Sequence, residues 1–185
     1  MSEFPSNAKR VFKGKIYEVW QWDQKMFDDS TEVFEGLKRP DTVEVIATAG
    51  GKILLQEQQQ PQSPEVFFSL PGGRADHGET PIKEIQRELL EETGYVSDDW
   101  QEWKAVKPHR KNDYTIRYFI ARNCRLQQAP QLDAGEKITT KLIAFEELLA
   151  LSDNPAFRGN EFIVWLLRLR LNPAEQEKFK KLLFK

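Results

Sequence analysis

The sequence predicts a sandwich of helices and a mixed β-sheet, in the α/β or α+β class, and two observations lead to this prediction. Segments with strand character come first, followed by one helix, more strands and a final group of helices, an order typical of a sheet covered by helices. No internal repeat or low-complexity linker interrupts the chain. Its 185 residues suit one domain with a small appendage and can bury a core without disulfide bonds.

The first forty residues are predicted to form an antiparallel β-hairpin region. Residues 11–22 are rich in aromatic and β-branched side chains and are predicted to form one strand. Asp28, Asp29 and Ser30 have the composition of a turn, and residues 31–37 that of a returning strand. We therefore divide the chain into an N-terminal β region, residues 1–40, and a main domain, residues 41–185.

The main domain is predicted to begin with a second set of strands. Residues 42–49 form a strand that the turn-forming pair Gly50-Gly51 joins to another at 52–57. Residues 58–64 are polar and contain proline, so we interpret them as a loop. A short apolar strand at 66–70 then leads into Pro71-Gly72-Gly73.

The clearest helix is predicted between Thr80 and Gly94. Threonine is favoured at the N-cap, and Pro81 is tolerated in the first turn. Ile85 and Leu89 lie four residues apart on one apolar stripe, and a glycine such as Gly94 often ends a helix. The remaining segments are predicted to form strands at 100–106 and 114–121, and helices at 145–151, at 159–171 and from Asn172 onward.

The composition narrows the class of protein. A formal net charge of −2 disfavours a duplex nucleic-acid partner, which usually meets a basic surface. No apolar run approaches the roughly 18 residues of a membrane span. Residues 1–10 hold no apolar stretch of the kind found in secretory signals. The single cysteine, Cys124, is interpreted as a small core residue at a strand end, and its isolation favours a reducing cytoplasm.

One stretch of the chain carries the chemistry. Five residues separate Gly73 from Glu79, and seven more separate Glu79 from Arg87-Glu88-Leu89. Glu91-Glu92 and then Gly94-Tyr95 follow, each after a single intervening residue. Three of the glutamates are three and four residues apart, so they can project from one region of a helix surface. Clustered carboxylates raise one another's pKa, and Mg²⁺ or Mn²⁺ would remove that penalty. The alternative is a solvated acidic face with an ordinary Arg87–Glu91 ion pair, which the fixed spacing of the whole stretch disfavours.

Residues 73–95 resemble the Nudix box, with every charged and glycine position in place. Tyr95 is the one soft departure, because a bulky aliphatic residue is usual there. The resemblance implies an α/β/α sandwich with a mixed central sheet and a hydrolase that acts on phosphorus anhydrides. It further implies a Mg²⁺ site, with Mn²⁺ as a substitute, and roles for Arg87 in orienting the glutamates and for Glu79 in tying the loop to the helix. The metal ligands implied are Glu88, Glu91, Glu92 and the backbone carbonyl of Gly72.

The layout of the whole chain is similar to the ADP-ribose and nucleotide-sugar pyrophosphatase branch of that family. This branch tends to have Glu-Gln-aromatic-Arg-Pro before the box, where this chain has Glu57-Gln58-Gln59-Gln60-Pro61. Gln60 replaces the arginine, so we expect a phosphate contact from one of three other arginines, Arg39, Arg74 or Arg110. Pro71-Gly72-Gly73 also departs from the Pro-Ala-Gly common in the branch.

The same resemblance suggests a general base and an oligomeric state. Some members carry the base on an acidic loop, for which Glu136 is our candidate and a solvated turn the alternative. N-terminal hairpins in the branch pair two subunits and can stack an aromatic on the nucleobase. Trp20 and Trp22 are candidates for that role, in a C₂ homodimer. The alternative is that they pack in a dimer or core without touching a base.

The expected reaction is Mg²⁺-dependent hydrolysis of the pyrophosphate bond in a nucleotide-linked small molecule. With ADP-ribose or a nucleoside diphosphate sugar, the products would be a nucleoside monophosphate and a sugar phosphate. One alternative keeps the chemistry but acts on nucleoside triphosphates, dinucleoside polyphosphates or RNA 5′ ends. Another is a non-catalytic nucleotide-binding module, although such proteins often lose the glutamates that this chain keeps.

Overall fold

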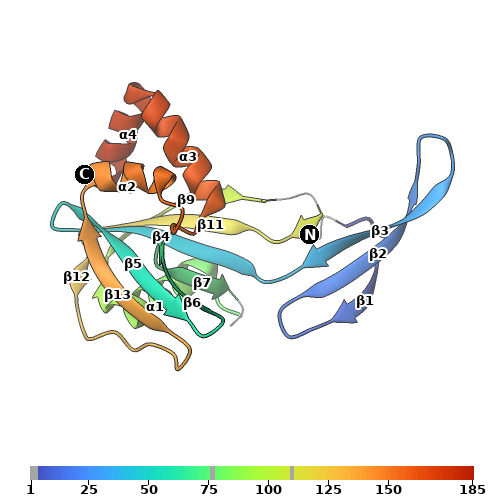
Figure 1. Ribbon diagram of the computed structural model, residues 1–185, viewed down its shortest axis with the longest axis horizontal. Coiled ribbons are helices and arrows are strands. Elements are labelled where there is room, and N and C mark those ends of the chain that lie inside the picture. The colour runs from blue at the N-terminus through green and yellow to red at the C-terminus, as the bar shows by residue number, and fades with distance from the viewer. Residues whose placement is uncertain (1–3, 76–77, 109–110) are drawn as a thin grey trace.

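The computed structural model describes residues 4–75, 78–108 and 111–185, apart from the side chain of Ser63. Helices and strands form a sandwich with a separate sheet on one side (Figure 1). In chain order the elements are β1 (Lys9–Lys13), β2 (Glu18–Lys25), β3 (Thr31–Lys38), β4 (Asp41–Ala49), β5 (Lys52–Gln60), β6 (Ser63–Ser69), β7 (Gly72–Ala75), α1 (Pro81–Thr93), β8 (Tyr95–Val96), β9 (Asp99–Val106), β10 (Asn112–Asp113), β11 (Ile116–Arg122), β12 (Arg125–Leu126), β13 (Lys137–Ile143), α2 (Phe145–Ala150), a 3₁₀ turn (Leu151–Asp153), α3 (Asn160–Leu171) and α4 (Pro173–Leu183).

The central sheet is mixed, as the resemblance implied. Its main strands follow the order β13-β5-β4-β11-β9, with β6 paired to β5 and β7 paired to β4. β4 and β11 run parallel, whereas the other neighbours run antiparallel. Because β4 lies in the middle of this order, β7 and the segment that follows it start from the centre of the sheet.

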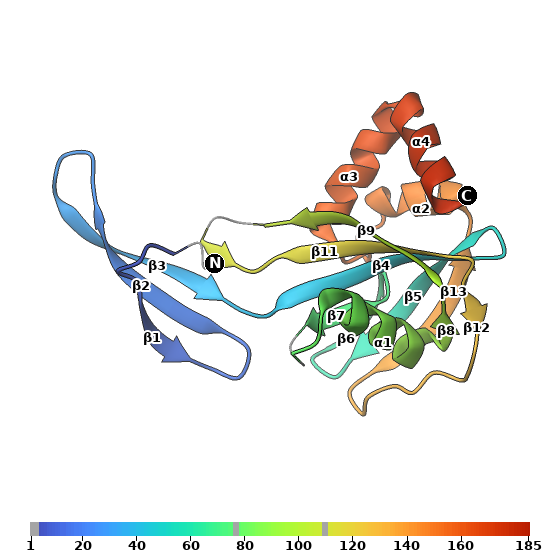
Figure 2. The ribbon, with the colours of Figure 1, turned by 180° about the vertical axis from the view of Figure 1, so that it is seen from behind.

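Helices cover both faces of the sheet. Figures 1 and 2 show α1 on one face and α2, α3 and α4 on the other. Alternate side chains of a strand point to opposite faces. On β4, Val43 and Val45 belong to the core that includes Ile85 and Leu89 of α1. Ile46 belongs instead to the core formed with the C-terminal helices. The predicted α/β/α sandwich is therefore confirmed.

Helix α1 begins and ends where the sequence predicted. The carbonyl of Thr80 accepts a hydrogen bond from the N–H of Lys83 at 2.9 Å, although the Thr80 side chain makes no capping bond. At the other end Gly94 adopts a left-handed φ of 76°, and its N–H donates to the carbonyl of Leu90 at 2.9 Å. Glycine adopts this conformation without steric cost.

The N-terminal strands β1, β2 and β3 form an antiparallel sheet that extends away from the sandwich, and β10 pairs parallel with β3 (Figure 1). On one face Phe4 stacks against Trp22, with ring centroids 5.5 Å apart, and lies 6.2 Å from Trp20. Gly36 on β3 pairs with Trp20 on β2, and a Cβ at this glycine would come within 2.4 Å of the Phe4 ring. The missing side chain therefore makes room for Phe4.

Two element predictions are wrong, and the first concerns residues 11–22. This segment is not one strand, because the chain turns after β1 and returns as β2. The N–H of Gly14 donates to the carbonyl of Tyr17 at 2.8 Å and closes the turn. Strand-forming composition continues on both sides of Gly14, so only the pairing of β1 with β2 reveals the break.

The second wrong prediction is the loop at 58–64. Strand β5 continues to Gln60, and β6 begins at Ser63. The polar composition is accommodated because the amide of Gln58 donates within the sheet face to Gln56 at 2.5 Å and to Ser69 at 2.6 Å. Side-chain hydrogen bonds within β5 and from β5 to β6 thus accommodate polar residues in a strand.

The other element predictions are confirmed to within a few residues. Gly50 and Gly51 both have positive φ, 56° and 74°, as a two-residue hairpin turn requires. Asn172 caps α4 by accepting a hydrogen bond from the N–H of Glu175 at 3.2 Å. Cys124 is buried after β11, and burial raises the pKa of its thiol to about 11. Within the described residues, every helix is too short or too polar to cross a membrane.

Candidate active site

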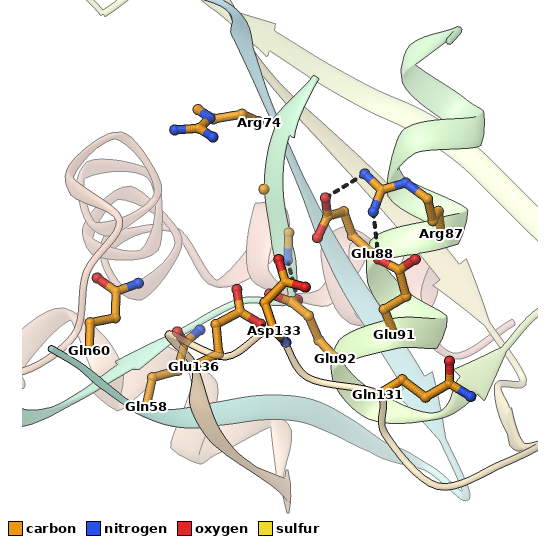
Figure 3. A pocket seen from close by; sticks show the side chains of 12 residues that line it. Gln58, Gln60, Arg74, Arg87, Glu88, Glu91, Glu92, Gln131, Asp133 and Glu136 are labelled. Atoms are coloured by element: carbon orange, nitrogen blue, oxygen red, sulfur yellow. Dashed lines mark hydrogen bonds and ion pairs between the residues drawn. The ribbon is translucent and has the colours of Figure 1, made fainter. Parts of the chain in front are cut away.

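A pocket of about 760 Å³ lies where α1, β7, the end of β5 and the loop before β13 meet (Figure 3). Five carboxylates and two guanidinium groups share this cavity, together with amides and backbone. It is therefore strongly polar and acidic. The lining residues are Gln58, Gln60, Gly72, Gly73, Arg74, Arg87, Glu88, Glu91, Glu92, Gln131, Asp133 and Glu136.

Helix α1 contributes three of the carboxylates from neighbouring positions on its surface. Glu88, Glu91 and Glu92 extend from the same side of the helix toward the loop that carries Asp133 and Glu136 (Figure 3). Burial raises the pKa of Glu88, and the nearby carboxylates of Glu91 and Glu136 raise it further against the opposing effect of the neighbouring arginine. The pocket therefore concentrates negative charge that a cation would stabilise.

Arg87 holds the glutamates of α1 in position. Its Nη2 donates to Glu84 at 2.8 Å and to Glu88 at 2.7 Å, and its Nη1 donates to Glu91 at 2.5 Å. Burial alone would lower the pKa of this guanidinium, but the surrounding glutamates raise it above its usual value. Glu84 is fully buried beside it, so its charge is compensated inside the protein and does not extend the acidic surface.

Glu92 is the most enclosed carboxylate of the pocket, with 5% of its surface exposed. Its Oε2 accepts one hydrogen bond from Nε2 of Gln56 at 2.7 Å and another from the backbone N–H of Gly72 at 2.9 Å. Burial raises the pKa of Glu92 to about 8, although the bond from Gln56 acts in the opposite direction. The orientation of this carboxylate is thus set by two donors from the sheet.

Three glycines allow the backbone to approach these groups closely. A Cβ at Gly73 would lie 2.8 Å from the carboxyl group of Glu88, and one at Gly72 would lie 2.1 Å from a carbonyl oxygen of β4. A Cβ at Gly94 would lie 2.0 Å from the carbonyl oxygen of Gln128. A side chain at any of the three positions would therefore displace either a carboxylate or a neighbouring segment.

The loop before β13 is anchored to the end of α1. The N–H of Gln131 donates to the carbonyl of Glu91 at 2.7 Å, and the N–H of Glu136 donates to the carbonyl of Asp133 at 2.9 Å. These bonds place Glu136 across the pocket from the α1 glutamates (Figure 3). Burial raises the pKa of Glu136, and the charges of Asp133 and Glu91 raise it further.

The structure gathers most of the predicted site residues into this pocket but not all of them. Arg74 lines it, and its side chain turns away from the glutamates in Figure 3. Arg39 lies elsewhere, with its guanidinium 4.4 Å from the ring centroid of Tyr114. Trp20 and Trp22 lie on the N-terminal sheet against Phe4, as described above. Arg110 lies outside the described residues, and Glu79 is exposed.

Three amide side chains at the site were not predicted from the sequence. Gln58 and Gln131 line the pocket, and Gln56 is completely buried behind Glu92. A signal was present in the sequence, because Leu54, Gln56 and Gln58 alternate along one strand and therefore face the same side of the sheet. Glutamine at successive core-facing positions is uncommon, since a buried amide requires hydrogen-bond partners.

The donor set of the pocket suits a hard divalent cation. Carboxylates and a backbone carbonyl are the ligands that Mg²⁺ and Mn²⁺ prefer. Among the described residues, however, no three His, Cys, Asp or Glu side chains already form a metal cage. Glu88 and Glu91 form ion pairs with Arg87. Binding of a cation would therefore require some rearrangement of these side chains.

Comparison with known proteins places this geometry in context. The family model described as "NUDIX domain" matches residues 38–166. The chain is 26% identical over 149 residues to the ADP-ribose pyrophosphatase of Bacillus subtilis (strain 168), covering 79% of this chain and 80% of that protein. It is 24% identical over 174 residues to the methanol dehydrogenase activator of Bacillus methanolicus, covering 92% and 94%.

A solved structure supports the same fold. The crystal structure of an ADP compounds hydrolase superposes with a TM-score of 0.73, covering 91% of this chain and 94% of that one. The two sequences are 18% identical, so this likeness concerns the fold.

Proposed function

The chain belongs to the Nudix family and is a Nudix hydrolase, and from this premise we propose that it cleaves the pyrophosphate bond of ADP-ribose or a nucleoside diphosphate sugar. The products would be a nucleoside monophosphate and a sugar phosphate. The observation that carries the proposal is the convergence of the carboxylates of Glu88, Glu91, Glu92 and Glu136 on one pocket. The ADP-ribose pyrophosphatase of Bacillus subtilis, similar over most of this chain, supports the choice of substrate.

We propose Mg²⁺ as the cofactor, with Mn²⁺ as a substitute. Glu88, Glu91, Glu92 and the carbonyl of Gly72 would hold it, since these four residues line the pocket and offer oxygen ligands. When bound, the cation supplies charge neutralisation for the phosphates and lowers the pKa of a water molecule. Arg87 contributes by holding Glu88 and Glu91 on the pocket side of α1.

Glu136 is proposed as the general base. It faces the α1 glutamates from the opposite wall, and its raised pKa makes it a better proton acceptor than an exposed carboxylate. Arg74 and Gln60 line the same pocket and would contact the phosphates and the sugar. Gln60 offers neutral donors where an arginine is usual in the branch, so Arg74 would supply the charge.

A homodimer built on the N-terminal sheet completes the proposal. Trp20 and Trp22 lie away from the pocket of their own chain, so contact with a nucleobase would have to come from a second subunit. Arg39 would approach the substrate in the same arrangement. The lone thiol of Cys124 and the absence of a basic excess are compatible with a cytoplasmic enzyme acting on small molecules.

A substrate screen tests the function. The full-length protein is incubated with Mg²⁺ and ADP-ribose, several nucleotide sugars, NADH, a dinucleoside polyphosphate or the nucleoside triphosphates, and the products are separated by chromatography. We expect a nucleoside monophosphate and a sugar phosphate, and no products in the presence of EDTA. Glu92→Gln should lower turnover by at least about 10- to 100-fold, because it removes a charged ligand.

Glu146→Gln serves as the matched control, because it removes a carboxylate from the exposed surface of α2. It should leave turnover unchanged. Preferred hydrolysis of triphosphates or dinucleoside polyphosphates would instead support the alternative substrate class. No turnover of any compound would contradict the proposal and favour a binding role.

A further inference from the structure

Gln56 occupies a position in β5 where the fold calls for an apolar residue. Its neighbour two positions earlier, Leu54, is fully buried in the core beneath α1, and Gln56 faces the same side. The side chain of Gln56 is also fully buried, with 0% of its surface exposed. Burying an amide without hydrogen bonds costs several times what burying a methylene gains. Its presence there needs a polar partner, and Glu92 is that partner.

A relay of hydrogen bonds fixes the orientation of the Gln56 amide. Its Oε1 accepts from Nε2 of Gln58 at 2.5 Å and from Oγ of Ser69 at 3.3 Å. The amide oxygen is thereby held on the side of β6, which forces Nε2 toward α1. There it donates to Oε2 of Glu92 at 2.7 Å. The donors from Gln58 and Ser69 therefore determine which end of the Gln56 amide faces β6. The amide nitrogen is left to donate to the carboxylate of Glu92.

The hydrogen bond from Gln56 restricts the orientation of the Glu92 carboxylate. Oε2 of Glu92 already accepts from the N–H of Gly72, so the bond from Gln56 gives this oxygen a second donor. One oxygen is thus committed to the protein, and the carboxylate cannot rotate without losing both bonds. An apolar side chain at position 56 would leave only the bond from Gly72, about which the carboxylate could turn.

We propose that Gln56, oriented by Gln58 and Ser69, is a positioning residue that fixes the carboxylate of Glu92 for cation binding in the pocket. The inference rests on the proposed function, because it assumes that Glu92 is a ligand. Groups that hydrogen-bond to a metal-ligating side chain commonly influence both metal affinity and activity. Gln56 itself lies behind Glu92 and does not line the pocket.

The test replaces Gln56 with methionine, which keeps an unbranched side chain of similar size and removes both hydrogen-bonding groups. The dissociation constant of Mn²⁺ is measured by electron paramagnetic resonance without substrate, and kcat and KM are measured separately. We expect Gln56→Met to weaken Mn²⁺ binding by about tenfold and to lower kcat with little change in KM. Gln59→Met is the matched control, since Gln59 lies on the other face of β5 and bonds to the carbonyl of Pro64.

A double mutant shows whether Gln56 acts through Glu92. In a Glu92→Gln background the carboxylate ligand is already lost, so adding Gln56→Met should change the Mn²⁺ dissociation constant by less than about twofold. An equal effect in both backgrounds would overturn the inference, and so would a folded Gln56→Met protein with unchanged Mn²⁺ affinity. Should Gln56→Met fail to fold, Ser69→Ala removes one member of the relay and must weaken Mn²⁺ binding in the same direction.

The outcomes separate this inference from the function on which it rests. Absence of Mn²⁺ binding and turnover in the unmodified chain would overturn both. Tight Mn²⁺ binding and turnover in the unmodified chain, undiminished by Gln56→Met and by Ser69→Ala, would overturn the positioning role alone.

Discussion

Three carboxylates near the sheet, two of them buried and one partly buried, differ in how their charge is compensated. Glu84 is neutralised by an ion pair with Arg87. Glu92 accepts two hydrogen bonds from the sheet. Glu44 on β4 has no hydrogen-bond or ion-pair partner among the described residues, and burial raises its pKa to about 7. A carboxylate without a partner costs folding energy whenever it is ionised.

The pH dependence of stability follows from Glu44. Its folded pKa of about 7 lies above the unfolded value of 4.5, so the folded state holds the proton more tightly. Stability is therefore highest below pH 4.5 as far as this group is concerned, and it falls as the pH rises toward 7. Replacing Glu44 with glutamine removes the ionisation and should stabilise the protein at pH 8 by on the order of 1 to 3 kcal/mol.

Thermal unfolding at pH 4, 6 and 8 measures this effect. The Tm difference between Glu44→Gln and the unmodified chain should be small at pH 4 and grow with pH. Glu32→Gln, at an exposed position of β3, should show no such trend. A Tm difference independent of pH would mean that Glu44 is not the titrating group.

Helix α1 and the loop before β13 form one functional unit. The helix carries its glutamates at positions set by its own periodicity, whereas the loop depends on the helix for its place. Its backbone bonds to the carbonyls of Glu91 and Gly94, and Gly94 must lack a side chain for the loop to approach. The proposed base, Glu136, is therefore aligned with the glutamates through backbone contacts at the helix end.

Replacing Glu136 should affect turnover strongly and substrate binding only slightly. Glu136→Gln keeps the size of the side chain and removes its ability to accept a proton, so kcat should fall by about 100-fold with little change in KM. Steady-state kinetics with the substrate identified in the screen measures both constants. Asp133→Asn is the comparison, because Asp133 lines the same wall. A larger loss of kcat in Asp133→Asn would transfer the role of base to Asp133.

At the scale of the whole molecule, one face of the N-terminal sheet exposes several large apolar side chains. Phe12, Val33 and Leu37 are 58%, 65% and 41% exposed. Leu37 pairs with Val19 on β2, which pairs in turn with Phe12 on β1, so these side chains share one face. Phe4 covers the opposite face. An apolar sheet face that extends away from the sandwich is typical of a subunit interface.

A charge on that face should dissociate the proposed dimer. Val33→Glu places a carboxylate on this exposed face, so we expect sedimentation to show a monomer where the unmodified chain is a dimer. Val164→Glu makes the same change at a half-exposed residue of α3 and should leave the assembly intact. A monomeric unmodified chain would contradict the dimer itself.

Local interactions determined those parts of the protein that could be predicted from its sequence. Helix α1, its glycine end and the spacing of Glu88, Glu91 and Glu92 depend on contacts within about one or two helical turns, and so does the turn at Gly50-Gly51. The family and the reaction class were implied by the resemblance of residues 73–95 as a whole to the Nudix box. The roles assigned to individual site residues remain predictions for the experiments above.

Only the tertiary structure decided which distant residues meet. The strand character of Gln58–Gln60 depends on pairing with β6 and β13, and the partnership of Gln56 with Glu92 joins residues 36 positions apart. The placement of Glu136 in the pocket and of Trp20, Trp22 and Arg39 outside it likewise depends on how β5, α1 and the N-terminal sheet pack. No local periodicity encodes these contacts, because their free energy arises only when the sheet has formed and brings the segments together.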